Sequence, residues 1–314
     1  MSSSLPKVFA LLGPTASGKT SLALALAERF PVEIISLDSA LVYQDMDIGT
    51  AKPNTEELAA VPHHLINIIS PLQSYNAAQF VTDCVRLVNS IHARGRWPLL
   101  VGGTMMYFHA LTQGLNNLPG ANLEIRTKLN QLKAQYGITH LFTLLQQLDP
   151  ITAARLPAGD SQRIERALEI YFLSGKPMSS QLNAQQSTQP QLNIFSLALL
   201  PENRAQLHKQ IAQRFETMLN LGLIDEVVAL RQKYPTLNPH LPSIRCVGYR
   251  QAWDYLSGQT DYADFVERSI IATRQLAKRQ LTWLRKLNLN LTVDPFTAQH
   301  LVQQTQTIMS QFFS

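Results

Sequence analysis

One glycine-rich segment constrains the possible fold of this chain more than any other. It fits the pattern G-x-x-x-x-G-K-[ST] and consists of Gly13, Pro14, Thr15, Ala16, Ser17, Gly18, Lys19 and Thr20. An apolar run, Val8 to Leu12, precedes it, and a helical pattern follows. The backbone N–H groups of such a loop can surround a diphosphate, Lys19 adds a positive charge, and the Thr20 hydroxyl can bind Mg²⁺. We therefore predict a phosphate-binding P-loop; the alternative is a glycine-rich turn without a ligand.

The composition is that of a globular protein without a membrane or secretion signal. The chain has 314 residues, of which 45% are hydrophobic and 16% charged, so it can bury a sizeable core and favours two domains. No apolar run approaches the roughly 18 residues of a membrane span, and Met1 to Lys7 is too polar and short for a secretory signal. We expect a cytoplasmic monomer with no membrane partner.

The cysteines and histidines show no pattern of a metal site or a disulfide. Cys84 and Cys246 are far apart in sequence and form no C-x-x-C motif, so we interpret both as packing residues. None of the eight histidines has a metal-ligand spacing, and we expect His63 and His64 in a loop.

Two further apolar stretches predict strands that end beside the P-loop. Val32 to Leu37 is followed directly by Asp38, and Trp97 to Val101 is followed by Gly102 to Thr104. Strand, loop and helix recur three times by residue 110, which favours a parallel sheet with right-handed crossovers. Because ligands in open α/β sheets bind beyond the carboxyl ends of the strands, we expect Asp38 to face the P-loop. Its alternative role is the N-cap of a following helical turn.

A helical insertion is expected to interrupt this sheet. Strand signals disappear between Leu118 and Met178, where Asn122, Gly137 and Asp149-Pro150 punctuate short helices. The polar segment Gln181 to Gln191 is interpreted as a linker, and the apolar residues 194–200 predict a returning strand. The predicted class is α/β, with a P-loop NTPase-like parallel sheet flanked by helices and an all-helical insertion domain. The expected domains are residues 1–117 (first part of the core), 118–188 (insertion) and 189–314 (second part of the core).

Basic residues of the insertion lie off its apolar stripe. In the predicted helix Asp160 to Ser174, Arg163 and Arg166 alternate with buried positions and are expected to be free to meet an anion. A solvated helix face is equally compatible with this spacing.

A second group of basic residues lies near the carboxyl end of the chain, after a predicted helix over Arg204 to Leu221. From Arg268 to Lys286, within a predicted helix that begins at Tyr262, there are six basic residues and no acidic one, which favours a polyanionic partner. Trp283 lies among them, as in nucleic-acid-binding helices, or alternatively as a core residue. The segment Leu241 to Arg250, expected as a loop, contains two arginines that could bind a phosphate backbone.

Two other functions share these features. A kinase for a small molecule or nucleoside also has a P-loop and a parallel sheet, but the basic helix argues against it. A non-catalytic RNA-binding switch that uses nucleotide to change shape would have little use for Asp38 and the Gly102 to Thr104 loop.

Taken together, the motifs resemble the bacterial tRNA dimethylallyltransferase family, whose members prenylate the adenosine beside the anticodon. The resemblance runs through seven segments in the family's order, at residues 13–20, 38–43, 46–53, 102–104, 160–168, 242–250 and 272–285. It implies dimethylallyl diphosphate as the donor, the anticodon stem-loop of tRNA as the acceptor, and Mg²⁺ as a cofactor. The P-loop would hold the donor's diphosphate, and ATP is expected to be a poor ligand.

The resemblance also implies roles for individual residues. Asp38 would be the general base, Thr104 would contact the reacting centre, and Lys19, with Mg²⁺ on Thr20, would stabilise the departing diphosphate. The target base must leave its stack, so arginines that hold the opened anticodon loop would belong to the mechanism. The residues implied in tRNA binding are Asp38, Ser39, Ala40, Leu41, Thr104, Arg126, Gln162, Arg163, Ile164, Glu165, Arg166, Arg245, Cys246, Val247, Gly248, Tyr249, Arg250, Lys278, Arg279, Gln280, Leu281, Thr282, Trp283, Leu284 and Arg285.

Overall fold

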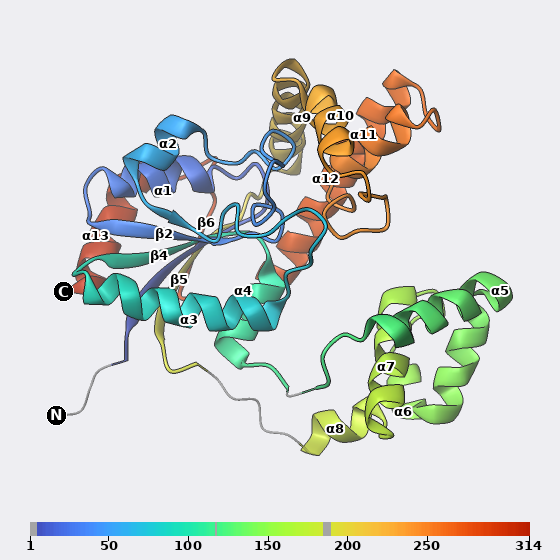
Figure 1. Ribbon diagram of the computed structural model, residues 1–314. Coiled ribbons are helices and arrows are strands. Elements are labelled where there is room, and N and C mark those ends of the chain that lie inside the picture. Colours follow the sequence, from blue (N-terminus) through green and yellow to red (C-terminus); the bar gives the residue numbers. More distant parts are fainter. Residues whose placement is uncertain (1–4, 117, 185–189) are drawn as a thin grey trace. The chain divides into compact units, whose positions relative to one another are not determined.

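The computed structural model describes residues 5–116, 118–184 and 190–314, and the chain divides into two compact units (Figure 1). The larger unit consists of Met1–Thr112 and Pro190–Ser314, and the smaller unit of Gln113–Gln189. The chain thus leaves the larger unit once and returns to it. The predicted insertion, residues 118–188, lies within the smaller unit.

A six-stranded parallel sheet forms the centre of the larger unit. The strand order is β3-β2-β4-β1-β5-β6, and all neighbouring strands run parallel. Leu12 and Leu37 both lie opposite Gly102, so β1, β2 and β4 end at the same edge. The strands are β1 (Lys7–Leu12), β2 (Val32–Leu37), β3 (His63–His64), β4 (Trp97–Gly102), β5 (Asn193–Leu199) and β6 (Leu291–Val293).

Four strands agree with the apolar runs of the sequence, and two do not follow from them. The apolar segments predict β1, β2, β4 and β5 to within about a residue at each end. In contrast, β3 and β6 are too short to show a pattern. His63 and His64, expected in a loop, form the edge strand β3, so that expectation is wrong.

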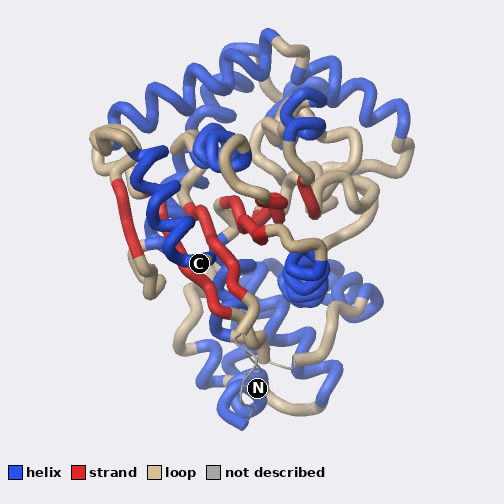
Figure 2. Tube along the Cα trace, turned by 90° about the vertical axis from the view of Figure 1, so that its left-hand side faces the viewer, coloured by secondary structure: helices blue, strands red, loops and turns tan. Residues whose placement is uncertain are grey.

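Helices cover both faces of the sheet, because successive strand residues point to opposite sides (Figures 1 and 2). Val8 belongs to the core under α3 and α4, whereas the next residue, Phe9, belongs to the core under α1 and α13. Asn76 and Gln79 form the predicted capping box at the start of α3. The bounds of these helices and of a short peripheral one are α1 (Lys19–Ala27), α2 (Thr55–Ala60), α3 (Ala77–Ala93), α4 (Met105–Gln113) and α13 (Leu301–Phe313).

Four more helices of the larger unit pack around Phe215, Val227 and Phe265. The sequence patterns predict two of them, α9 and α12, but not α10 or α11. Gly222, which predicts the end of α9, has a φ of 95° and is also the N-cap of α10. The expected loop at residues 241–250 consists of turns and runs into the first turn of α11. The helices are α9 (Arg204–Asn220), α10 (Leu223–Lys233), α11 (Tyr249–Leu256) and α12 (Tyr262–Leu284).

The smaller unit is helical, as predicted. Asn122 caps its first helix, Gly137 interrupts that helix with a φ of 79°, and Asp149 caps the next. Asp149 also accepts hydrogen bonds from the N–H and hydroxyl of Ser179 (2.9 and 2.7 Å), which fixes α8 to α6. The expected linker is partly wrong, because its first residues, up to Ala184, extend α8, while residues 185–189 lie outside the described residues. The helices are α5 (Leu123–Leu148), α6 (Pro150–Ala153), α7 (Ser161–Ser174) and α8 (Met178–Ala184).

Among the residues that the structure describes, no helix has the length and apolar character needed to cross a membrane. Over the same ranges, no group of histidine, cysteine, aspartate and glutamate side chains is arranged to hold a metal ion. Cys84 is buried in the core, and Cys246 is partly buried; both thiols are free.

Candidate active site

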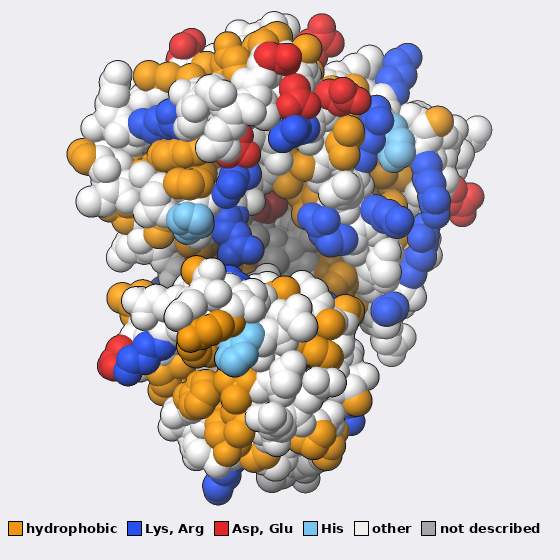
Figure 3. Space-filling model, turned by 90° about the vertical axis from the view of Figure 1, so that its right-hand side faces the viewer, with side chains coloured by type: hydrophobic (Ala, Val, Ile, Leu, Met, Phe, Trp, Pro, Cys, Tyr) orange, Lys and Arg blue, Asp and Glu red, His pale blue; other side chains and the backbone are white. Residues whose placement is uncertain are grey.

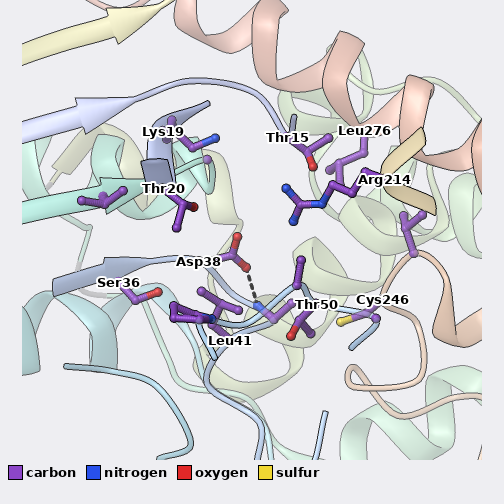
Figure 4. A pocket seen from close by; sticks show the side chains of 18 of the residues that line it. Thr15, Lys19, Thr20, Ser36, Asp38, Leu41, Thr50, Arg214, Cys246 and Leu276 are labelled. Atoms are coloured by element: carbon purple, nitrogen blue, oxygen red, sulfur yellow. Dashed lines mark hydrogen bonds between the residues drawn. The ribbon is translucent and has the colours of Figure 1, made fainter. Parts of the chain in front are cut away.

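A cavity of about 180 Å³ opens beside the P-loop at the carboxyl edge of the sheet, entirely within the larger unit (Figure 4). The P-loop contributes Thr15, Lys19 and Thr20 to its wall, and the ends of β2 and β4 contribute Asp38 and Gly102-Gly103. Helices α9 and α12 contribute further residues to the wall, among them Arg214 and Gln280. The structure therefore brings together the three segments that the sequence analysis places at one edge of the sheet.

The P-loop is held in its curved form by local hydrogen bonds and by glycine. The Ser17 hydroxyl donates to the Pro14 carbonyl oxygen (2.9 Å) inside the loop. A Cβ on Gly13 would lie 2.7 Å from the Ser17 oxygen, so the curve needs glycine there. Gly18 has a φ of 86° and is the N-cap of α1, where glycine is favoured. The loop thus leads directly into a helix N-terminus, a favourable place for an anion.

Two cations and one carboxylate face the cavity. Figure 4 shows the Lys19 ammonium, the Arg214 guanidinium and the Asp38 carboxylate around one open space. Burial and, to a smaller extent, the charge of Arg214 lower the pKa of Lys19 to about 7, while Asp38 acts in the opposite direction. Burial also lowers the pKa of Arg214, again against Asp38. Mutually repelling, poorly solvated cations are stabilised when an anion binds between them, so the cavity suits a diphosphate.

Arg214 is absent from the sequence prediction. It lies on α9, far from every motif in the sequence, and its position follows from the packing of α9 against α12. No local pattern marks it, because a single arginine in an amphipathic helix resembles a solvated surface residue.

Asp38 is positioned by a turn and not by a helix. Its Oδ1 accepts a hydrogen bond from the Ala40 N–H (2.8 Å), and residues 39–42 form a bend and a turn. The N-cap alternative is therefore wrong. Its other oxygen, Oδ2, has no hydrogen-bond donor among the described residues, and the carboxylate points towards Lys19 and Arg214 in Figure 4. This oxygen is available to accept a proton from a substrate.

Thr104 and the two glycines before it fix the geometry around Asp38. The Thr104 hydroxyl oxygen accepts from the Ser39 N–H (3.0 Å), which ties the end of β4 to the segment after β2. A Cβ on Gly102 would lie 2.1 Å from the Leu37 carbonyl oxygen, so no larger residue fits at this register position. Thr104 therefore orders the segment that carries Asp38.

Gln280 of α12 joins the P-loop to the glycine segment. Its Oε1 accepts from the Thr15 N–H (2.9 Å), and its Nε2 donates to the Gly103 carbonyl oxygen (3.0 Å). The side chain lines the cavity, and tRNA contact through it stays a prediction.

Glu226 of α10 holds a loop that lines the cavity and is also absent from the sequence prediction. Its carboxylate accepts from the N–H groups of Asp47, Ile48 and Gly49 at 2.8, 2.7 and 3.2 Å. It also accepts from the Tyr249 hydroxyl at 2.5 Å. The held loop presents residues 49–51 to the cavity.

The predicted tRNA-binding residues of the larger unit fall into four groups. Tyr249 and Leu284 are fully buried and Leu281 nearly so, which corrects their assignment as RNA contacts. Cys246, Val247 and Gly248 line the cavity beside Ala40 and Leu41. Arg250 is held by Asp254 and the Pro239 carbonyl oxygen. The exposed residues are Arg245, Lys278, Arg279, Thr282, Trp283 and Arg285.

In the smaller unit, Glu169 holds two of the predicted arginines. Arg126 and Arg166 each donate to its carboxylate at 2.8 Å, so the expectation that Arg166 is free is wrong. Burial raises the pKa of Glu169, but hydrogen bonds from Arg126, Asn122 and Arg166 outweigh it and leave the pKa below its ordinary value. The i,i+3 spacing of Arg166 and Glu169 is a signal that could have revealed this pair.

The remaining predicted residues of the smaller unit differ in exposure. Ile164 is fully buried in the helical core, which corrects its assignment as an RNA contact. Glu165 accepts from Lys133 (2.6 Å), whereas Gln162 and Arg163 are exposed.

Known proteins resemble this chain over nearly its whole length. A family model described as IPP transferase matches residues 41–287. A tRNA dimethylallyltransferase of Neisseria meningitidis serogroup A is 62% identical over 292 residues, 93% of each chain. One from Burkholderia cenocepacia is 58% identical over 90% of this chain and 88% of the relative.

Solved structures of the same kind share the fold. The full-length tRNA isopentenylpyrophosphate transferase of Bacillus halodurans is 34% identical, with a TM-score of 0.69 over 98% of this chain and 96% of that one. A eukaryotic dimethylallyltransferase, described as acting on tRNA, is 27% identical, with a TM-score of 0.79 over 98% and 79%. The chain therefore belongs to the IPP transferase family, that of the tRNA dimethylallyltransferases.

Proposed function

We propose that this protein transfers a dimethylallyl group from dimethylallyl diphosphate to tRNA. The acceptor is the exocyclic amine of the adenosine on the 3′ side of the anticodon, and diphosphate is released. The observation that carries the proposal is the cavity in which Lys19 of the P-loop and Arg214 lie around one open space, while Oδ2 of Asp38 has no hydrogen-bond donor among the described residues. We further propose that the protein acts as a monomer in the cytoplasm.

The reaction divides into three changes of bonding. The allylic carbon–oxygen bond breaks, and its electron pair leaves with the diphosphate. The adenine N6 forms a bond to the same carbon, and the proton that N6 loses passes to Oδ2 of Asp38. Help from such a general base is worth roughly 10² to 10⁴ in rate.

The departing diphosphate is stabilised by groups that are in place before the reaction. The P-loop N–H groups, Lys19 and Arg214 surround the position where its negative charge develops. Preorganised donors of this kind in a water-excluded site contribute more than they would in water.

The residues present fit a magnesium ion shared with the substrate. The described residues contain no protein-only cluster of metal ligands, but Thr20 offers a hydroxyl oxygen in the cavity wall. Mg²⁺ commonly takes one or two protein oxygens together with substrate phosphates and water. When bound, the ion would neutralise charge on the leaving diphosphate, with Thr20 as its protein ligand.

For tRNA, we propose contacts from exposed basic residues in both units. Arg163 of α7, Arg245 before α11 and the α12 residues Lys278, Arg279 and Arg285 are exposed and meet this requirement. Arg126 and Arg166 remain proposed contacts, oriented by Glu169.

The deciding experiment incubates the protein with Mg²⁺, dimethylallyl diphosphate and unmodified tRNA, and analyses the digested tRNA by mass spectrometry. We expect an adenosine that has gained a dimethylallyl group, and we expect Lys19→Ala to abolish it. Arg86→Ala is the control, since Arg86 is an exposed cation on α3 paired with Asp83. ATP in place of the donor should leave the tRNA unchanged.

The kinase alternative predicts the opposite pattern. If the tRNA returns unmodified while ATP is consumed and a small molecule gains phosphate, the transferase proposal is wrong.

A further inference from the structure

A second groove lies between α9 and α12, outside the active-site cavity. Leu207, Ala277 and Leu281 are buried at its base. The same two helices line the active-site cavity through other residues, among them Arg214 and Gln280. A ligand in this groove would therefore lie against the helices that hold the donor site.

The rim of the groove is strongly basic. Arg204 lies on α9, Arg274 and Lys278 lie on α12, and Arg285 is the C-cap of α12, while no acidic residue lines the groove. None of the four side chains has an ion-pair or hydrogen-bond partner among the described residues. Some other exposed cations of the larger unit are paired with a carboxylate, such as Arg268 with Asp264 at 3.0 Å. The rim charges are therefore available to a partner.

The spacing of these charges suits a chain of phosphates more than a single ion. At 1.5 Å per residue, Lys278 lies about 6 Å and Arg285 about 16 Å beyond Arg274 along α12, and all three fall on one side of the helix. Arg204 adds a cation from the other wall. Figure 3 shows Lys and Arg side chains gathered in a band along one side of this face of the molecule.

We propose that this groove binds the sugar–phosphate backbone of the tRNA substrate, with Arg204 and Arg274 as phosphate contacts and His208 as a further hydrogen-bonding group. This inference rests on the proposed function and extends it, because no family motif of the sequence includes α9. Helix α9 would then contact both substrates, the donor through Arg214 and the RNA through its first two turns.

The test measures tRNA binding by the full-length protein at salt concentrations from 50 to 300 mM. One phosphate contact contributes about 0.9 to the slope of log K against log salt, or about fivefold in affinity at 0.15 M salt. We expect Arg204→Ala and Arg274→Ala each to reduce the slope by about one and to weaken binding about fivefold. The KM for dimethylallyl diphosphate should not change.

Lys209→Ala is the matched control. It removes the same charge from the same helix at an exposed position that does not line the groove, so we expect less than a twofold effect. If Arg204→Ala and Arg274→Ala weaken tRNA binding no more than Lys209→Ala, the inference is wrong. Loss of binding to phosphatidylglycerol vesicles, with tRNA binding intact, would instead assign the groove to a membrane surface.

Different results would refute the proposed function and the proposed role of the groove. A wild-type protein that binds tRNA through the groove but transfers no dimethylallyl group would refute the proposed function alone. A wild-type protein that prenylates tRNA while the groove variants bind normally would refute the groove alone.

Discussion

Replacing Glu226 by glutamine tests whether the loop at residues 47–51 must be fixed for the donor to bind. The carboxylate accepts three backbone N–H groups of this loop and the Tyr249 hydroxyl. Glutamine keeps the size of the side chain but turns one acceptor oxygen into a donor that faces other donors. The loop is closely fitted, since a Cβ on Gly49 would lie 2.5 Å from the Tyr249 ring.

The expected loss can be worked out from these contacts. Hydrogen bonds to a charged group contribute roughly 1.5–3 kcal/mol each, but water can replace them at the exposed end of the loop. We expect the free energy of unfolding to fall by about 2–4 kcal/mol. Donor binding must then order Thr50 and Ala51, at about 1 kcal/mol per residue, and the total of about 2 kcal/mol corresponds to roughly a thirtyfold rise in donor KM.

The assay combines urea unfolding, donor KM and hydrogen exchange of the loop amides. Exchange of the Asp47 to Gly49 amides should accelerate in Glu226→Gln. Glu216→Gln is the control, because Glu216 is an exposed carboxylate on α9. An unchanged donor KM together with unchanged amide exchange would show that Glu226 does not position the loop.

Three further results are expected. Asp38→Asn should retain tRNA and donor binding but slow single-turnover prenylation by about 10² or more; near-normal turnover would exclude it as the base. Lys278→Ala should reduce the salt slope of tRNA binding by about one, and a salt-independent affinity of the wild type would argue against a nucleic-acid partner. The pKa of Glu169 is lowered on folding, so its stabilisation is present above pH about 4.5 and lost as the pH falls through its folded value. The melting temperature should therefore fall less steeply below that pH in Glu169→Gln than in the wild type.

The sequence predicts those elements of the fold and the site that are determined by residues close together in the chain. An apolar run such as Val32 to Leu37 forms a strand that is buried on both faces of a parallel sheet. Its residue pattern therefore predicts the strand without knowledge of the fold. The P-loop and Asp38 follow such runs directly, so the edge on which they meet is also predictable.

What could not be predicted depends on contacts between distant segments. Glu226 bonds to Ile48 across 178 positions of the chain, and Gln280 bonds to Thr15 across 265. Glu226 belongs to no local pattern, and although Gln280 lies in the segment 272–285, no window of neighbouring residues shows its contact with Thr15. The burial of Tyr249 has the same origin, since its ring is enclosed by segments far away in the sequence.

Helix α12 connects the proposed donor site to the proposed RNA-binding surface, and its contact with the P-loop bears on the choice between a diphosphate and ATP. Gln280 occupies the Thr15 N–H and so removes one donor of the P-loop from any phosphate. A triphosphate needs more of the loop than a diphosphate does, which makes this arrangement less suited to ATP. On the exposed side of the same helix, Lys278 lies two residues before Gln280. Because a continuous helix fixes the spacing of its residues, RNA phosphates bound at Lys278 would lie at a set distance from a diphosphate bound beside Gln280. Under the proposed function, one helix would thus align the two substrates.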